Sequence, residues 1–282
     1  MKRIILSLCV LTTCICANAQ TFTYKGLKYS VQGLSYEKAV INKKRNNRAT
    51  LESYNLTKEK VIVLPDTVTN GTERYYVRDI ASHAFENNTT IESIQLPAKT
   101  RAIGAMAFSR CTALKSITIP ASIRIISPWA FGNCTNLNKV TLTNRVKVID
   151  SNAFANCPSL TTFDIPGSVN RISGYAFANC INLKNVKLNK GINIIGTKAF
   201  ADCKSLSEIT IPNTVYEFGD AVFAGSGIKA LRILRKHPAK VSAKTFDGID
   251  TSTVTLYVPR NQISRYRKDE IWNKFKNIKE LN

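Results

Sequence analysis

The fold follows from the stretch Ala107-Phe108-Ser109-Arg110-Cys111-Thr112-Ala113-Leu114-Lys115-Ser116-Ile117-Thr118-Ile119-Pro120, because its pattern recurs along most of the chain. Phenylalanine returns at one constant interval of twenty-three positions, at Phe85, Phe108, Phe131, Phe154, Phe177, Phe200, Phe223 and Phe246. Cysteine follows five of them three residues later, at Cys111, Cys134, Cys157, Cys180 and Cys203. Self-similarity at a fixed period of this length is the signature of a repeat architecture.

Each repeat contains the elements of one coil. Leu114-x-x-Ile117-x-Ile119 has the spacing of a leucine-rich repeat, in which alternate side chains point inward from a short strand. Proline ends that strand in several repeats, for example at Pro120, because proline cannot donate to a β-ladder. A second extended stretch, such as 123–126, leads back to the next phenylalanine. The segment between them, with Phe131, Cys134 and Leu137 spaced three apart, predicts a helical or 3₁₀ turn.

A single coil of this length cannot bury its apolar face alone, so neighbouring coils must stack and share a core. The predicted fold is therefore a repeat solenoid: a right-handed leucine-rich repeat coil with short parallel β-strands and short helical or 3₁₀ turns, capped at both ends. The predicted divisions are a signal peptide over 1–19, a β-rich cap and first irregular coil over 20–79, repeats over 80–252 and a C-terminal cap over 253–282. We expect 24–31 to be a strand, Thr69-Asn70-Gly71-Thr72 a hairpin turn, and 261–282 a short helix.

The first 19 residues have the plan of a secretory signal. Lys2-Arg3 precedes an apolar run over 4–16, and Ala17-Asn18-Ala19 supplies small residues for cleavage. The run is too short to span a bilayer, which takes about 20 residues, and no later segment is apolar enough to do so. We expect export to the outer surface or the medium, with the periplasm as the alternative. Loss of Lys2 and Arg3 lowers the formal net charge from +21 to +19.

These residues resemble the BspA-like leucine-rich repeat proteins of bacterial surfaces. The resemblance covers about 80–259 through the unit A-F-x-x-C-x-x-L-x-x-I-x-I-P, and extends to the tail Trp272-x-x-Phe275-x-x-Ile278. It implies host matrix proteins or other cells as partners. The pattern changes where Asn88 and Ser226 replace the cysteine.

The cysteine column has three possible roles. All cysteines outside the predicted signal belong to it, and stacked strands would place neighbouring thiols about 5 Å apart, a distance that a disulfide accepts. A buried ladder of small apolar side chains is favoured, because five thiols cannot all pair and parallel side chains point alongside one another. Metal binding is least favoured, since CxxC pairs and nearby histidines are missing. The predicted core ladder comprises Phe108, Cys111, Phe131, Cys134, Phe154, Cys157, Phe177, Cys180, Phe200 and Cys203.

The chain carries no recognisable catalytic pattern. Its two histidines, His83 and His237, belong to no motif, and G-x-S-x-G, H-E-x-x-H and phosphate-binding glycine loops are absent from the sequence. We therefore expect a protein that is not an enzyme and needs no cofactor or metal.

The basic residues fall into columns when the repeats are stacked. Arg101, Arg124 and Lys147 occupy equivalent positions in the return stretch, before its last apolar residue. The front strand contributes the further candidates Lys115, Lys139, Lys184, Lys187, Lys229 and Arg232. Two readings stay open: the cations keep exposed strands soluble and protected from edge pairing, or they meet an anionic partner.

The repeat, the leader-like segment and the basic columns together predict a binding function. We expect an exported, non-enzymatic binding protein, a surface or secreted adhesin that recognises extracellular proteins or anionic glycans through the solenoid surface. The alternative is a structural or assembly protein of the bacterial envelope. Nucleic acid is not an expected partner, because the cluster Lys43-Lys44-Arg45 lacks interleaved aromatic residues. The expected oligomeric state is a monomer.

Overall fold

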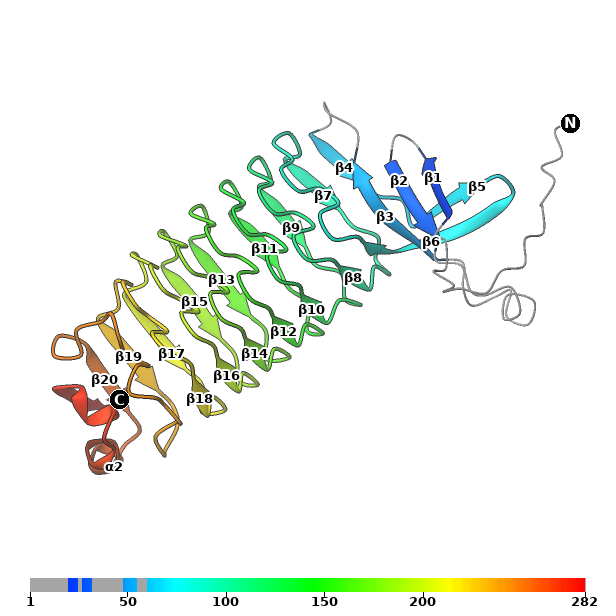
Figure 1. Ribbon diagram of the computed structural model, residues 1–282. Helices are drawn as coiled ribbons and strands as arrows, with labels where there is room; N and C mark the ends of the chain where they lie inside the picture. The colour runs from blue at the N-terminus through cyan, green and yellow to red at the C-terminus, as the bar shows by residue number, and fades with distance from the viewer. Residues whose placement is uncertain (1–19, 25–26, 32–47, 55–59, 282) are drawn as a thin grey trace, which may run out of the picture.

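The computed structural model describes residues 20–24, 27–31, 48–54 and 60–281. It is a rod of stacked coils, with a mixed, mostly antiparallel sheet at the N-terminal end and a short helix at the C-terminal end (Figure 1). The predicted solenoid of short parallel strands is confirmed. The predicted signal peptide and the cluster Lys43-Lys44-Arg45 lie outside the described residues.

Front strands line one side of the rod. They are β4 (Val61–Val63), β7 (Ser93–Gln95), β9 (Ser116–Thr118), β11 (Lys139–Thr141), β13 (Thr162–Ile165), β15 (Asn185–Leu188), β17 (Glu208–Ile211), β19 (Ala230–Ile233) and β20 (Thr255–Val258). Most neighbours pair in parallel, and in the regular coils the register is one repeat, so that Ile117 lies opposite Val140 and Phe163 opposite Val186. The side chains at this column point inward, which is why an apolar residue recurs there.

Return strands line the other side and are mostly two residues long. They are β8 (Ala102–Ile103), β10 (Ile125–Ile126), β12 (Val148–Ile149), β14 (Arg171–Ile172), β16 (Ile194–Ile195) and β18 (Glu217–Phe218), and they continue from the end of β6 (Glu73–Ile80). The second residue of each, such as Ile126 or Ile149, is buried, and the first points away from the core. Exposed residues that flank these strands therefore form columns along the rod.

The segments between return and front strands are successive turns, and the prediction of a helical turn there is wrong. The amide of Cys111 donates to the Phe108 carbonyl at 3.1 Å, and that of Ser109 to Met106 at 3.0 Å. Both bonds span three residues, as in a 3₁₀ helix, but the φ angles of Met106 (57°) and Arg110 (58°) are positive. A right-handed helix cannot continue through left-handed residues, so each bond closes a separate β-turn.

A phenylalanine ladder fills the centre of the rod. Successive rings from Phe85 to Phe223 have centroids 4.9 to 6.0 Å apart, and their planes differ by no more than 14°. The ring centroid of Phe163, from front strand β13, lies 5.0 Å from that of Phe154 in a tilted contact and 4.8 Å from that of Phe177 in an edge-on contact. Because every ring contacts its neighbour in the next coil, the core is continuous along the rod.

The N-terminal end carries a sheet of mostly antiparallel strands. Its order is β1 (Gln20–Tyr24), β2 (Leu27–Val31), β3 (Arg48–Tyr54), β6 and β5 (Thr67–Asn70). The single strand expected over 24–31 is therefore wrong, because Tyr24 and Leu27 pair across a hairpin. The predicted turn at Asn70-Gly71 joins β5 to β6, and Gly71 has the positive φ (61°) that a tight hairpin requires.

The C-terminal end combines α2 (Ile263–Lys268), the 3₁₀ turn η1 (Trp272–Lys274) and β21 (Asn277–Glu280). The expectation of a helix over this whole segment is wrong in part, because β21 pairs in parallel with β20 and extends the front sheet. Trp272 is buried and its indole Nε1 donates to the Ala239 carbonyl at 3.1 Å. The ring centroids of Phe246 and Trp272 lie 5.0 Å apart in an edge-on contact, so an aromatic cluster continues the core beyond the phenylalanine ladder.

Candidate binding surfaces

The cysteine column is buried and its thiols are hydrogen-bond donors. Each Sγ donates to the carbonyl of the phenylalanine in the preceding coil, at 3.1 to 3.2 Å: Cys111 to Phe85, Cys134 to Phe108, Cys157 to Phe131, Cys180 to Phe154 and Cys203 to Phe177. All five thiols are free. Burial raises their pKa values, to about 12 for Cys111 and Cys180. A protonated, buried thiol is a poor nucleophile, so this column contributes to packing and not to chemistry.

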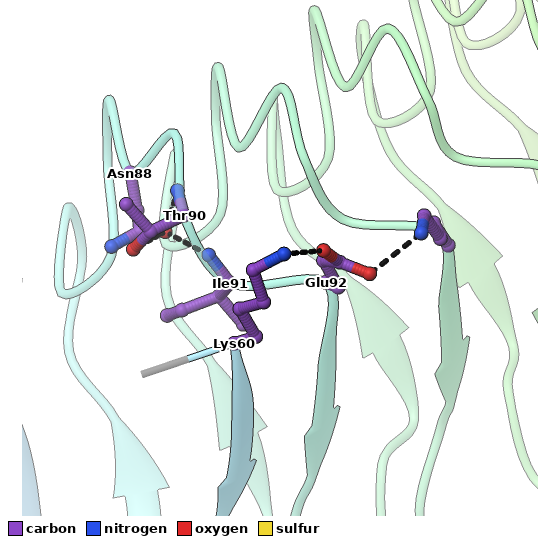
Figure 2. A network of polar contacts seen from close by, with 6 residues as sticks. Lys60, Asn88, Thr90, Ile91 and Glu92 are labelled. Atoms are coloured by element: carbon purple, nitrogen blue, oxygen red, sulfur yellow. Dashed lines mark hydrogen bonds and ion pairs between the residues drawn. The ribbon is translucent and has the colours of Figure 1, made fainter. Parts of the chain in front are cut away.

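Asn88 replaces the column cysteine in the first repeat, and the structure gives a reason. Its carboxamide oxygen accepts hydrogen bonds from the amides of Thr90 (3.0 Å) and Ile91 (2.8 Å) (Figure 2). The first coil is irregular, because Ile62 of strand β4 pairs with Ile94 thirty-two residues later, and no phenylalanine lies one repeat length before Phe85. Asparagine at this position closes the turn through its own neighbours.

Three cations of the front side are paired with carboxylates. Glu92 accepts from Lys60 at 2.9 Å and from Lys115 at 2.6 Å (Figure 2), and these bonds lower the pKa of its carboxyl to about 2. Lys187 lies 3.7 Å from Asp164, its register partner on the neighbouring strand. Opposite charges at adjacent positions of a sheet attract, so these three side chains are locally neutralised.

The remaining front candidates differ in their surroundings. Arg232 lies 3.6 Å from a Glu208 oxygen, and its guanidinium stacks 4.4 Å from the Tyr257 ring. Lys139, Lys184 and Lys229 are exposed and form no ion pair within the part of the chain that the structure describes. The front side is thus a mixed surface in which half of the predicted cations have a carboxylate partner.

The return side carries a column of cations. Arg101, Arg124 and Lys147 are exposed and occupy equivalent positions in successive coils, as shown by the bond from the Lys147 amide to the Arg124 carbonyl at 2.7 Å. The structure adds Arg78, whose carbonyl accepts from the Arg101 amide. Sequence reasoning missed Arg78 because it lies in the irregular first coil, although it precedes Arg101 by one repeat length.

A second column lies beside the first, and a hollow of about 980 Å³ opens between them. Lys99, Ser122 and Arg145 make up this second column, and they too follow one another by one repeat length. We call this feature the cationic hollow. It is lined by Arg78, Ala98, Lys99, Arg101, Ala102, Ala121, Ser122, Arg124, Ile125, Ser127 and Arg145. Five of these eleven side chains are cationic and none is a carboxylate.

The hollow concentrates positive charge. Two unit charges at one strand spacing, ~4.8 Å, repel by about 0.9 kcal/mol in water. Arg78 and Lys99 also lie over one ring, at 4.9 and 5.9 Å from the Tyr76 centroid. Asp79 follows Arg78 on β6 but does not line the hollow. The arrangement therefore attracts anions and lacks a lining carboxylate to neutralise it.

The front side has a groove of a different character. A hollow of about 610 Å³ runs over β4, β7 and β9, and its lining contains no charged side chain. Val61 and Val63 of β4 are exposed by 65 % and 64 %. The uncharged groove over the front strands and the cationic hollow therefore adjoin each other near the N-terminal end of the rod, since Ala98 and Ala121 line both.

Comparison with known families identifies the repeat. The model of the BspA type leucine-rich repeat region, in six copies, matches residues 54–184 and 170–268. The chain belongs to the BspA-type leucine-rich repeat family. A search of curated proteins returned no match.

A comparison with solved structures matches this BspA-type protein to several bacterial proteins. A leucine-rich repeat protein from Bacteroides ovatus is 20 % identical, with a TM-score of 0.50 over 92 % of this chain and 76 % of that one. A leucine rich cell surface protein from Faecalibacterium prausnitzii is 19 % identical (TM-score 0.37; 93 % and 95 % covered). The pneumococcal vaccine antigen PcpA is 16 % identical (TM-score 0.39; 94 % and 99 % covered).

The family fold is one that typically serves binding or scaffolding. Within the described ranges of this BspA-type protein, no group of three or more His, Cys, Asp or Glu side chains is placed to hold a metal ion. Its histidines lie far apart in the sequence: His83 contacts Glu86 at 2.5 Å, and His237 contacts Arg265 at 2.7 Å. None of the helices in the described segments has the length and apolar character needed to cross a membrane.

Proposed function

We propose that this BspA-type repeat protein is an exported, non-enzymatic binding protein that acts as an adhesin at the cell surface or in the medium. Its ligand is an extracellular protein or an anionic glycan, bound on the side of the solenoid. Export is supported by the leader-like residues 1–19, and a binding role by the repeat family. The candidate cations serve this role unequally, because Arg101 and Arg124 of the return side line a hollow.

One observation carries the proposal. The front cations Lys115, Lys187 and Arg232 have carboxylate partners, whereas the cationic hollow gathers five cations without a lining carboxylate. Cations that only confer solubility need no such segregation, since paired charges would serve equally well. A surface that keeps like charges together loses electrostatic energy in the free protein and regains it when an anionic partner binds.

The test combines location with binding. Cell fractionation and surface protease digestion locate the protein, and the purified chain is then applied to immobilised extracellular matrix proteins and anionic glycans. The proposal expects protease-accessible or released protein that binds at least one of these surfaces. Protection behind the outer membrane, with no binding, would contradict it and favour an assembly role in the envelope.

A further inference from the structure

We infer that the cationic hollow binds a linear anionic polysaccharide that lies along the rod axis, across successive coils. This inference rests on the proposed function and names its ligand class and site. The hollow is bounded by two columns, and each column repeats the same backbone position in consecutive coils. Its charges therefore form two rows parallel to the axis, which match an extended chain more closely than a compact ligand.

The spacing of the rows sets the charge spacing of the ligand. Arg78, Arg101, Arg124 and Lys147 follow one another by one coil, and parallel strands lie ~4.8 Å apart. The first three of these cations line the hollow and Lys147 lies one coil beyond them, so the whole row extends over roughly 15 Å. It ends after Lys147, because Asn170 and Asn193 occupy the next two positions. A ligand segment with about four anionic groups in line would use the whole row.

Arginine predominates among these cations, which bears on the anionic group. Four of the five cations in the hollow are arginines, and the guanidinium fork binds the two oxygens of a sulfate or carboxylate together. Ser122 and Ser127 also line the hollow; their hydroxyls donate to the backbone carbonyls of Thr100 and Ile103, and their oxygens can still accept from sugar hydroxyls. Sulfate and carboxylate groups on a sugar chain share this recognition chemistry, so a polysaccharide that carries either group fits the hollow.

The other side chains favour a sugar chain over nucleic acid. The lining consists of small or aliphatic residues such as Ala98, Ala121 and Ile125, and no aromatic side chain lines it. Single-stranded nucleic acids bind through aromatic residues interleaved with cations. A neighbouring ring, that of Tyr76, already lies against Arg78 and Lys99. The hollow instead offers serine oxygens and small apolar residues between its cations, which suit the hydroxyl groups and the CH faces of a sugar chain.

The experiment measures affinity of the full mature chain for heparin and hyaluronan octasaccharides by calorimetry at several salt concentrations. Heparin carries sulfates and carboxylates, and hyaluronan carries carboxylates alone. The site variant is Arg101→Gln/Arg124→Gln. The matched control is Lys274→Gln/Lys276→Gln, which removes the same charge from two exposed lysines of the C-terminal end.

The inference expects the site variant to bind at least one oligosaccharide about tenfold more weakly, since each of the two solvent-exposed ion pairs contributes about threefold. The fall of log affinity with log salt concentration should also become less steep, by about 1.5. The control should keep the original affinity and slope. Circular dichroism of both variants confirms that the fold is retained.

Three results would overturn the inference. Equal weakening in the site and control variants would show that net charge alone governs binding. Tighter binding of a single-stranded DNA 12-mer than of either oligosaccharide would assign the hollow to nucleic acid. Absence of glycan binding in a chain that is surface-exposed and binds an extracellular protein would refute this inference and leave the proposed function intact.

Discussion

The buried thiols make the solenoid sensitive to alkaline pH. Their ordinary pKa is 9.0, and desolvation raises it in all five, to about 12 in Cys111 and Cys180. A raised folded-state pKa means that the folded protein holds its thiol protons more tightly than the unfolded chain. The resulting stabilisation is fully present below pH 9 and is lost as pH rises toward 12.

The size of the effect depends mainly on the unfolded-state pKa. Each buried thiol loses about 0.4 kcal/mol of stabilisation at pH 9 and about 1.4 kcal/mol at pH 10. Five such thiols therefore remove roughly 2 and 7 kcal/mol from the free energy of unfolding. Ordinary proteins are stable by about 5–15 kcal/mol, so the rod should be marginal near pH 10.

Urea unfolding under reducing conditions, followed by far-ultraviolet circular dichroism at pH 7, 9 and 10, measures this loss. Replacing Cys134, Cys157 and Cys180 by alanine should remove about three-fifths of the pH dependence, although the variant is less stable at pH 7. An unfolding midpoint that stays constant from pH 7 to 10 would show that the folded protein does not hold its thiol protons more tightly than the unfolded chain. A triple variant with an unchanged pH dependence would show that the thiols are not its cause.

Three further substitutions test the core and its ends. Phe131→Ala should lower the free energy of unfolding by about 3–5 kcal/mol, because it breaks the ring ladder; a loss under ~1 kcal/mol in urea titrations would contradict the packing. Asn156 has a positive φ (58°), and its carboxamide donates to Asn133 at 2.9 Å. Asn156→Ala should therefore lower the free energy of unfolding by about 1–2 kcal/mol in thermal melts, and Asn156→Gly by less. The reverse order would exclude backbone strain as the cause. Trp272→Ala should increase hydrogen exchange around Phe246 while the central coils stay protected, and uniform exchange would contradict a local cap.

The repeat period determines most of what could be predicted. A column such as Ile117, Val140 and Phe163 has to face inward in every coil, so the stacking and the parallel front strands follow from spacing alone. The turns could not be predicted in this way, because a three-residue spacing suits a 3₁₀ helix and successive β-turns equally. A further signal was present: asparagine at 133 and 156, where φ is positive, tolerates the left-handed region that a helix excludes.

The candidate site was only partly predictable. Stacking placed Arg101 and Arg124 in one column, but the hollow also needs Arg78, Lys99 and Arg145, which lie in the first coil and in a second column. Ion pairs on the front side form between side chains of neighbouring coils, such as Lys115 and Glu92. The repeat alignment shows which residues share a column, but it does not show which of them form ion pairs. Irregular ends and lateral contacts therefore needed the three-dimensional structure.

The most direct test of the account is a map of backbone amide chemical shifts as a heparin octasaccharide is titrated into the mature protein. We predict that the changes cluster in the return side of the first coils, around Arg78, Arg101 and Arg124, and diminish beyond Lys147. Changes centred on the front strands β13 and β15, or changes spread evenly over every exposed lysine, would contradict the claim that the cationic hollow is the binding surface.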